Sequence, residues 1–359
     1  MIEKFTIARD DSLYHAWPDV ALTPGGRLVC VFSECTHHGN RDYTRIMACH
    51  SDDRGRTWSP KRPITEALRF KADQPPMRWW NCPRITQLGD GRLAVVVDRI
   101  TAREANDESQ SDTAENLLLF SGDDGQTWTD PVATPVRGIV PDQLIELVHG
   151  PHKGRWVLAA HARIGEAFST WQERCWLSDD RGTTWQGPFV IAESSQLRLC
   201  EGSVLQLPTG ELVCFMRENS GRGLDAFKCI STDGGCTWTG LTEFPLPGCH
   251  RPVAAMLQSG RVLITHRFMQ GGQGWVGWWT QNFFAALTDV ESCLAPHRRH
   301  AHTRILPIDF DRSLMSDTGY SGHVQFDDGE LYLVNYIVDD APHAQIRGYA
   351  LREADFILA

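Results

Sequence analysis

Six polar or ionisable residues stand at comparable places along the chain, each shortly before a turn of the form Gly-(Arg/Glu) that opens an apolar run. The set is Asp19, Arg84, Asp142, Glu201, Arg251 and Tyr320. Guanidinium groups match a carboxylate with two parallel hydrogen bonds, and a carboxylate can take the proton of a phenol. If these residues meet, we expect a site for an anionic ligand such as an acidic sugar.

A second polar set lies where the apolar runs end. It comprises Glu34, Asp98, Arg99, His161, Arg163, Arg217, His266, Arg267 and Asn335. When a tight turn joins two strands, the start of the first and the end of the second lie at the same edge. Both sets should therefore converge. The residues alone leave open a second interpretation, in which they form a polar channel of mutually satisfied ion pairs.

The elements that position these residues are six similar hairpins. The Gly turn recurs in "PGGRLVCVF", "GDGRLAVVV", "HKGRWVLAA", "PTGELVCFM", "QSGRVLITH" and "DDGELYLVN". Each copy follows another short apolar segment, and each pair predicts a hairpin with one or two further strands behind it. The pattern predicts an all-β fold, a six-bladed β-propeller with four-stranded antiparallel blades. We expect residues 1–359 to form a single propeller domain, with "EKFTIAR" near the N-terminus closing the last blade.

A second repeat, S-x-D-x-G-x-T-W, occurs at Ser51–Trp58, Ser121–Trp128, Ser178–Trp185 and Ser231–Trp238. Ser and Asp bind turn backbone, Gly accepts a positive φ, and Trp packs between strands. We expect each copy to form a turn after the third strand of its blade, as part of the scaffold rather than of the site.

Composition narrows the function classes. The 359 residues are 42% hydrophobic and 22% charged, and the formal net charge of -10 argues against nucleic-acid binding. The sequence has no apolar stretch of membrane-spanning length and no signal-like apolar segment near its start, so we expect a cytoplasmic protein without membrane contact. The 11 cysteines lack C-x-x-C pairs and are expected to be buried thiols. No metal or organic cofactor is indicated, and the sequence does not indicate an oligomeric state.

The box and blade patterns together resemble the sialidase superfamily, whose six-bladed propellers carry such Asp-boxes. The segment "CEGSVLQLPTGELVCFMREN" resembles the family segment in which a Glu precedes an arginine of the substrate-binding triad, here Glu201 and Arg217. "DTGYSGHVQFDDGELYLVNY" is similar to the segment with the nucleophilic tyrosine, here Tyr320. The resemblance implies a retaining exo-glycoside hydrolase acting on a sialic acid or related acidic sugar. Tyr320 would attack, and Glu201 would take its proton.

The resemblance also implies a general acid on the first-blade loop "ECTHHGNRDYTR". Asp42 is the candidate there, although Glu34, His37 and His38 could also protonate a leaving group. Adjacent histidines can suggest a metal, but no third ligand stands at a supporting spacing.

The first blade departs from the family pattern. It reads "HAWPDVAL", with Trp17 and Asp19 where the family has its first triad arginine. Arg84, Arg251 and Arg267 are candidates to complete the carboxylate clamp. Asp19, and Asp142 in the same channel, are expected near the substrate, where an acidic residue would favour a related or neutral sugar.

Two other functions are compatible with the same residues. A propeller polysaccharide lyase acting on a uronate would use Arg, Tyr and His, and His161, His250 and His266 are available. A noncatalytic glycan-binding propeller would need neither a nucleophile nor its base, so the combination of Glu201, Arg217 and Tyr320 favours an enzyme.

Overall fold

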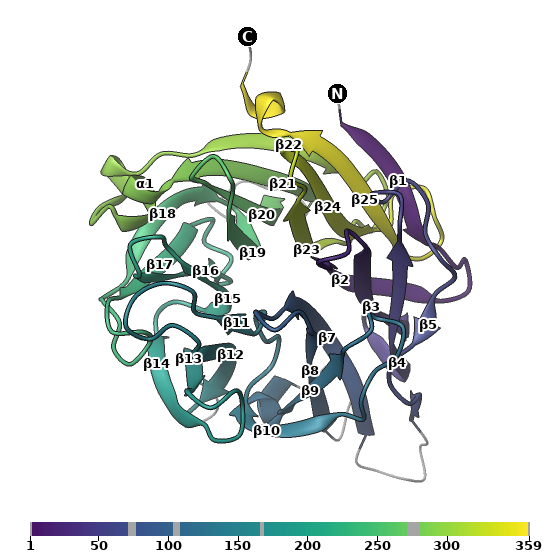
Figure 1. Cartoon of the computed structure of the whole chain (residues 1–359), viewed down its shortest axis with the longest axis horizontal. Helices are drawn as coiled ribbons and strands as arrows, with labels where there is room; N and C mark the ends of the chain where they lie inside the picture. The colour runs from purple at the N-terminus through teal and green to yellow at the C-terminus, as the bar shows by residue number, and fades with distance from the viewer. Residues whose placement is uncertain (1, 71–76, 103–107, 166–168, 271–279, 358–359) are drawn as a thin grey trace.

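The computed structural model describes residues 2–70, 77–102, 108–165, 169–270 and 280–357. These residues form six antiparallel sheets arranged in a ring (Figure 1). The fold is therefore all-β, a six-bladed propeller with four-stranded blades, which confirms the prediction from the repeated hairpins.

The first three blades follow one another along the chain. Blade I contains β2 (Tyr14–Leu22), β3 (Leu28–His37), β4 (Asn40–Ser51) and β5 (Arg62–Pro63), with β6 (Leu68–Arg69) also paired to β4. Blade II contains β7 (Met77–Gln87), β8 (Leu93–Ala102), β9 (Glu115–Ser121) and β10 (Val132–Arg137). Blade III contains β11 (Ile145–Glu146), β12 (Trp156–Ile164), β13 (Thr170–Ser178) and β14 (Gln186–Ser194).

The other three blades complete the ring. Blade IV contains β15 (Leu199–Gln206), β16 (Leu212–Glu218), β17 (Asp225–Ser231) and β18 (Thr242–Pro247). Blade V contains β19 (Cys249–Met256), β20 (Arg261–Gln270), β21 (Thr280–Asp289) and β22 (Arg304–Phe310). Blade VI contains β23 (Thr318–Gln325), β24 (Glu330–Ile337), β25 (Gln345–Arg352) and β1 (Glu3–Ala8). The described helices are short: α1 (Val290–Leu294) and 3₁₀ turns at Glu108–Thr113, Arg298–His300 and Glu353–Phe356.

The apolar core lies in layers between neighbouring blades. Leu177 of blade III packs in one cluster with Leu212 of blade IV, and Phe215 of blade IV shares another with Val262 of blade V. Strands covered on both faces are expected to read as continuous apolar runs. This arrangement explains "LVCVF" in β3, where all five residues are buried.

Each Asp-box lies directly after the third strand of its blade, as the sequence predicts. In the first copy the Ser51 hydroxyl accepts the Gly55 N–H at 2.8 Å, and Asp53 accepts the Thr57 N–H at 2.8 Å. The Trp58 indole donates to the Gly55 carbonyl at 3.1 Å. The other three copies repeat these bonds at 2.8–3.2 Å. The boxes are turn scaffolds at the ends of the third strands.

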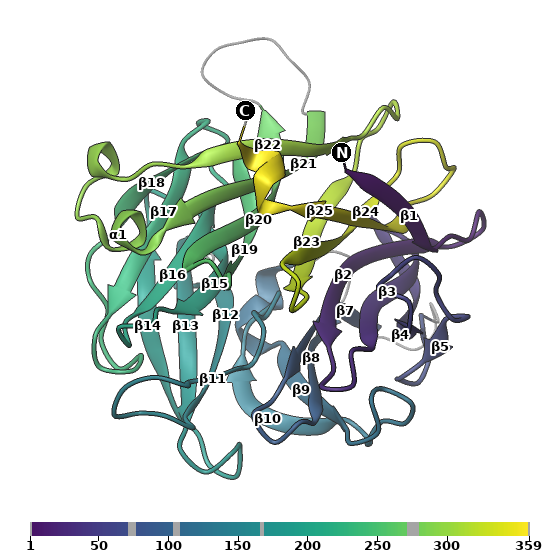
Figure 2. The same cartoon turned by 45° about the horizontal axis from the view of Figure 1, so that its top comes forward.

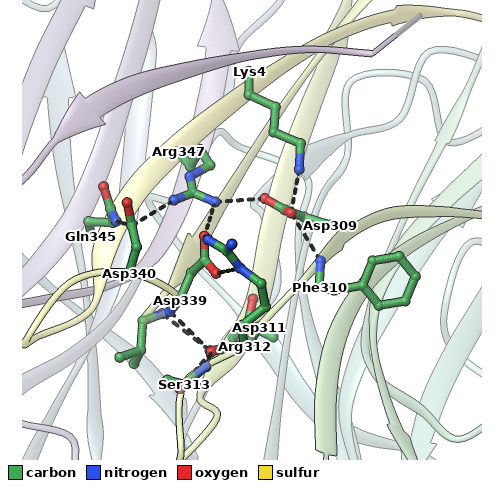
Figure 3. A network of polar contacts seen from close by, with 12 residues as sticks. Lys4, Asp309, Phe310, Asp311, Arg312, Ser313, Asp339, Asp340, Gln345 and Arg347 are labelled. Atoms are coloured by element: carbon green, nitrogen blue, oxygen red, sulfur yellow. Dashed lines mark hydrogen bonds and ion pairs between the residues drawn. The ribbon is translucent and has the colours of Figure 1, made fainter.

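The two chain ends meet in blade VI. Strand β1 pairs antiparallel with β25, with Lys4 opposite Tyr349, and the two strands lie side by side in Figure 2. A polar network ties this seam to blade V (Figure 3). Arg347 reaches Asp309 at 2.9 Å and Asp339 at 3.0 Å, and Lys4 pairs with Asp309. The ring is thus closed by a sheet that contains both ends of the described chain.

Candidate active site

The innermost strands carry irregularities that turn selected side chains toward one end of the channel. In five blades a non-glycine residue has a left-handed φ near the start of the inner strand: Trp17 at 55°, Val140 at 50°, Glu201 at 53°, Arg251 at 49° and Tyr320 at 55°. The ladder register shifts at four of these positions, from Ala16 to Asp19, Cys200 to Ser203, His250 to Val253 and Gly319 to Gly322. Such backbone costs about 1–3 kcal/mol per residue and is found where a bulge re-aims a side chain at a site.

A pocket of about 360 Å³ lies at the end of the channel toward which these side chains turn. Its lining includes Tyr320 and Glu201 from two bulges and Trp17 from a third. The ends of the second strands contribute Arg217 and His161. With Trp79 of blade II and Arg267 of blade V, the pocket receives residues of all six blades, as the hairpin pattern predicts.

The centre of the pocket is a tyrosine paired with a carboxylate. The Tyr320 hydroxyl donates to Oε1 of Glu201, although the two residues are 119 positions apart. Arg217 donates to the same oxygen at 2.6 Å, and its other terminal nitrogen donates to Asn219 at 2.6 Å. All three side chains are buried or nearly so.

This arrangement sets the protonation states of the pair. Burial by itself raises the pKa of Glu201, but Arg217, and Arg267 after it, bring that pKa well below its usual value. Burial and the charge of Glu201 raise the pKa of Tyr320 well above its ordinary value of 10. At neutral pH the Tyr320 phenol therefore keeps its proton, and its hydrogen-bond acceptor, Glu201, is an ionised carboxylate.

Three guanidinium groups line the pocket, those of Arg41, Arg217 and Arg267. Each has a buried Nε that makes no hydrogen bond within the described part of the chain. Arg267 donates to Gln281 at 3.0 Å and lies 5.3 Å from the centre of the Tyr320 ring. Glu201 is the sole carboxylate among the described residues that line the pocket, so cationic groups exceed anionic ones there and the site favours an anion.

Arg41 was missed by the sequence reasoning. Its guanidinium lies 4.0 Å from the centre of the Trp17 ring and donates to the Cys35 sulfur at 3.4 Å. Trp17 occupies the first-blade position where an arginine was expected, and Arg41 reaches the pocket from the neighbouring hairpin instead. The signal that could have identified Arg41 was its position in the first-blade loop, next to the candidate acid Asp42.

Asp42 is not brought to the pocket. Strand β4 begins at Asn40, and because side chains alternate along a strand, Arg41 and Asp42 point to opposite faces. Arg41 is buried, whereas Asp42 is exposed and its N–H donates to the Asn40 side chain at 2.8 Å. Asp42 is thus outside the lining of this pocket, and its role as the acid stays a prediction.

Four further predicted substrate-binding residues lie in the channel beneath the pocket rather than in its lining: Asp19, Arg84, Asp142 and Arg251. Asp19 accepts the Ile85 N–H at 2.8 Å, and Asp142 accepts the Val204 N–H at 2.7 Å. Arg84 donates to the Ser321 carbonyl at 2.8 Å, and Arg251 donates to the Gly202 and Pro141 carbonyls at 3.0 and 2.8 Å.

These bonds join neighbouring blades or blades separated by one other, so the four residues hold the ring together. Asp19 and Asp142 follow the left-handed residues Trp17 and Val140 by two positions, which places them one level deeper in the channel. Burial raises the pKa of both carboxyls, even though Arg84 and Arg251 oppose it. These four residues therefore lie outside the lining of this pocket, and their contact with a substrate stays a prediction.

His161 supplies a neutral donor to the pocket. Its Nδ1 accepts the Glu201 N–H at 3.2 Å, which places the ring proton on Nε2. Burial lowers the pKa of His161 to about 3, so the ring stays uncharged at neutral pH. His250 and His266, also noted in the sequence, are buried but are not part of the lining.

The described residues also bear on metal binding, membrane spanning and disulfides. Across the described ranges, no group of three or more His, Cys, Asp or Glu residues is arranged to hold a metal ion. Within those ranges, no helix has the length and apolar character needed to cross a bilayer. The 11 cysteines all lie within the described ranges and form no disulfide there, and ten of them are buried, as expected from their positions in apolar runs.

Residues 26–270 match the model of the BNR repeat-like domain. The chain belongs to this family. BNR-type propellers include the sialidases, and the chain is 25% identical over 219 residues to a sialidase of Clostridium perfringens. That match covers 56% of this chain and 53% of the clostridial protein, so the chain spans about half of its relative's length.

Solved structures give the same fold over almost the whole chain. A protein of unknown function from Dyadobacter fermentans superposes with a TM-score of 0.75 at 22% identity, covering 98% of this chain and 99% of that one. The Hadza microbial sialidase Hz136 has a TM-score of 0.71 at 17% identity, with 99% and 69% covered. These likenesses show the propeller fold, and the family match together with the curated sialidase relative supports a sialidase-superfamily propeller.

Proposed function

We propose that this BNR propeller is a retaining exo-glycoside hydrolase that acts on glycosides of an acidic sugar, such as a sialic acid. The observation that carries the proposal is the buried trio in which Tyr320 donates to Glu201 and Arg217 pairs with the same carboxylate. A phenol beside an ionised carboxylate is a nucleophile with its base already in place.

The proposed reaction proceeds in two displacements. Tyr320 Oη bonds to the anomeric carbon while the bond from that carbon to the leaving oxygen breaks. The phenol proton passes to Glu201, and an acid in the pocket gives a proton to the leaving oxygen. Water then attacks the anomeric carbon of the glycosyl-tyrosine and gives a proton back to the group that acted as the acid. The bond from Tyr320 to carbon breaks, and Tyr320 recovers its proton from Glu201. Two inversions give net retention.

The low pKa of Glu201 is compatible with this role because the proton moves during bond formation. In the resting pair the proton stays on the phenol. As Tyr320 Oη bonds to carbon, its proton becomes strongly acidic and moves to the carboxylate. A neutral phenol also avoids the repulsion that an anionic nucleophile would meet beside a substrate carboxylate.

The pocket supports an acidic, terminal sugar. Arg41, Arg217 and Arg267 line one cavity, and guanidinium groups bind carboxylates bidentately. A volume of about 360 Å³ is at the small end for ligand sites, which suits one sugar unit at a chain end rather than an internal stretch of polymer.

One observation favours a second candidate, a polysaccharide lyase that acts on a uronate. The uncharged His161 and Tyr320 share the pocket, and either group could move a proton while an arginine neutralises the uronate carboxylate. The hydrogen bond between Tyr320 and Glu201 favours hydrolysis, because elimination requires no bond from the phenol to the anomeric carbon.

Turnover of 4-nitrophenyl sialosides and uronides tests the proposal. We expect release of 4-nitrophenol from the sialoside, with proton NMR showing that the first product keeps the anomeric configuration. Tyr320→Phe should abolish turnover, whereas Tyr332→Phe should retain it, because Tyr332 is a buried tyrosine of the same blade that donates to the Gly55 carbonyl outside the pocket. An unsaturated, ultraviolet-absorbing product would instead establish the lyase. Full activity of Tyr320→Phe would refute the nucleophile.

A further inference from the structure

The proposed hydrolysis needs a proton donor for the leaving oxygen, and the pocket lining restricts the choice. Glu201 is occupied as the partner of Tyr320 and Arg217. His161 is uncharged, because burial lowers its pKa to about 3. Asp42, which the sequence favoured, is exposed and lies outside the lining. Among the described lining residues, His38 is the remaining side chain that can carry a transferable proton near neutral pH.

His38 lines the same pocket as the nucleophile and is held by a carboxylate. It lies on the turn between β3 and β4, with its side chain 43% exposed at the pocket. Its Nδ1 faces Oδ2 of Asp317. The Trp17 ring contacts His38 edge-on with centroids 5.3 Å apart and lies 6.5 Å from the Tyr320 ring. The Trp17 indole therefore neighbours both the His38 imidazole and the Tyr320 phenol.

Asp317 is built into the scaffold as an anion. It precedes β23, and its carboxylate accepts the Tyr336 hydroxyl at 2.7 Å and also the Tyr14 hydroxyl. Burial alone raises the pKa of Asp317, but His38, and Arg267 after it, bring that pKa well below its usual value. A buried carboxylate with three partners keeps its charge and fixes the orientation of the imidazole.

The loop that carries Asp317 is itself anchored. Asp311 accepts the Asp317 N–H at 3.0 Å and the Ser313 N–H at 2.9 Å. It also accepts the Asp339 N–H at 3.0 Å from the neighbouring loop (Figure 3). The Asp311 carboxylate therefore joins the β22–β23 loop to the β24–β25 loop. The position of Asp317 is thus fixed by its backbone as well as by the hydrogen-bond partners of its side chain.

We propose that His38 is the general acid and base of the glycosidase and that Asp317 is its positioning residue. The inference rests on the proposed hydrolytic function and deepens it. In the first step the imidazolium of His38 gives its Nε2 proton to the leaving oxygen as the glycosidic bond breaks and the Tyr320–carbon bond forms. In the second step neutral His38 takes a proton from the attacking water, and Tyr320 leaves with the proton held by Glu201. Each proton returns to its starting group, and no electrons are exchanged with an outside reagent.

Other titratable and charged groups also face this pair. They are Tyr14 from β2, His37 beside His38, Arg41 from β4, Arg267 from β20, Tyr336 from β24 and His343 from the β24–β25 loop. Arg41 and Arg267 are the cations among these groups. Asp317 is the anion that meets His38 at Nδ1, so replacing it by Asn removes the charge that holds the imidazole in its orientation.

The test compares two sialosides that differ in their need for an acid. Methyl sialoside has a poor leaving group that must be protonated, whereas 4-nitrophenolate leaves without help. In His38→Gln we expect kcat/KM for the methyl sialoside to fall on the order of 10²–10⁴-fold, and the loss for the 4-nitrophenyl sialoside to be far smaller. His37→Gln is the matched control on the same turn, since His37 is exposed and is not part of the lining. It should affect both substrates little.

Azide rescue and leaving-group dependence provide two readouts that a merely structural role would not change. Azide needs no general base, so it should restore breakdown of the glycosyl-enzyme in His38→Gln with the 4-nitrophenyl substrate and give a glycosyl azide. Asp317→Asn should lower kcat/KM for the methyl sialoside far more than for the 4-nitrophenyl sialoside, because the imidazole loses the carboxylate that orients it.

The possible failures are distinguishable. Equal losses on both substrates in His38→Gln, or a leaving-group-dependent loss in Asp42→Asn instead, would overturn the role of His38 while leaving the hydrolase intact. If the wild type cleaves neither sialoside, the proposed function fails and this assignment falls with it. Equal losses on both substrates in Asp317→Asn, or no loss on either, would refute the role of Asp317.

Discussion

Replacing Arg217 by Gln removes the cation that lies 2.6 Å from Glu201 and leaves a polar side chain in its place. The two side chains are only 11% and 7% exposed, so water screens the pair little. Removing one partner of a buried ion pair costs about 3–5 kcal/mol, because the remaining charge stays buried without compensation. We expect the free energy of unfolding near pH 7 to fall by about this amount.

The pH dependence of this loss has a definite sign. In the wild type the pKa of Glu201 is lower in the folded protein than in the unfolded chain, so its contribution to stability is lost as pH falls through the folded pKa. Burial is already the largest single influence on the pKa of Glu201, and without Arg217 less opposes it, so the folded pKa should rise. The penalty in Arg217→Gln should then grow as pH rises through that value and shrink as pH falls.

Arg27→Gln is the matched control for burial. Arg27 pairs with Asp52 at 2.7 Å, nearly the same distance, but the two side chains are 23% and 62% exposed. Exposed pairs contribute about 0–1 kcal/mol, so this variant should lose little. Urea unfolding followed by tryptophan fluorescence, at several pH values, measures both variants. Equal losses in the two variants, or a loss in Arg217→Gln that does not shrink toward acid pH, would refute the reasoning.

Three further outcomes are expected. Arg41→Gln should raise KM for the 4-nitrophenyl sialoside about 10–100-fold through loss of a charged hydrogen bond, and an unchanged KM would exclude Arg41 from the clamp. Burial raises the pKa of Glu173 to about 8, so wild-type stability should decline as pH rises through that value. Glu173→Gln should lack this decline in urea unfolding, and equal slopes would contradict the assignment. Gly55 and Gly26 have matching φ values of 83° and 84°, but a Cβ at Gly55 would lie 2.2 Å from the Tyr332 ring while one at Gly26 meets nothing within 4 Å. Gly55→Ala should therefore lower Tm clearly more than Gly26→Ala, and equal shifts would count against the packing role of the first box.

The fold could be predicted because its signals are local and repeated. Six copies of the Gly turn and four Asp-boxes each encode one hairpin or one turn, and an error in a single copy leaves the others to correct it. The Tyr320–Glu201 pair was also accessible, since both residues lie in segments that resemble a known pattern. Their hydrogen bond agrees with that interpretation.

The depth of residues in the channel could not be predicted in the same way. Counting back from each turn treats the inner strand as regular, but bulges there put non-glycine residues such as Glu201 at left-handed φ. Asp19 and Asp142 consequently lie deeper in the channel than the residues that line the pocket. Arg41 and Asp42 show the same sensitivity, because a one-residue difference in register exchanges the two faces of a strand. The pairing of His38 with Asp317 joins residues 279 positions apart, which no local pattern could reveal.

The central claim is that Tyr320 forms a covalent bond to the sugar, with Glu201 as its proton acceptor. Incubation with a 2,3-difluoro sialosyl fluoride, proteolysis and mass spectrometry would locate the trapped glycosyl group. The account predicts a single adduct on Tyr320 and none in Tyr320→Phe. An adduct on another residue, or inactivation that persists in Tyr320→Phe, would contradict it.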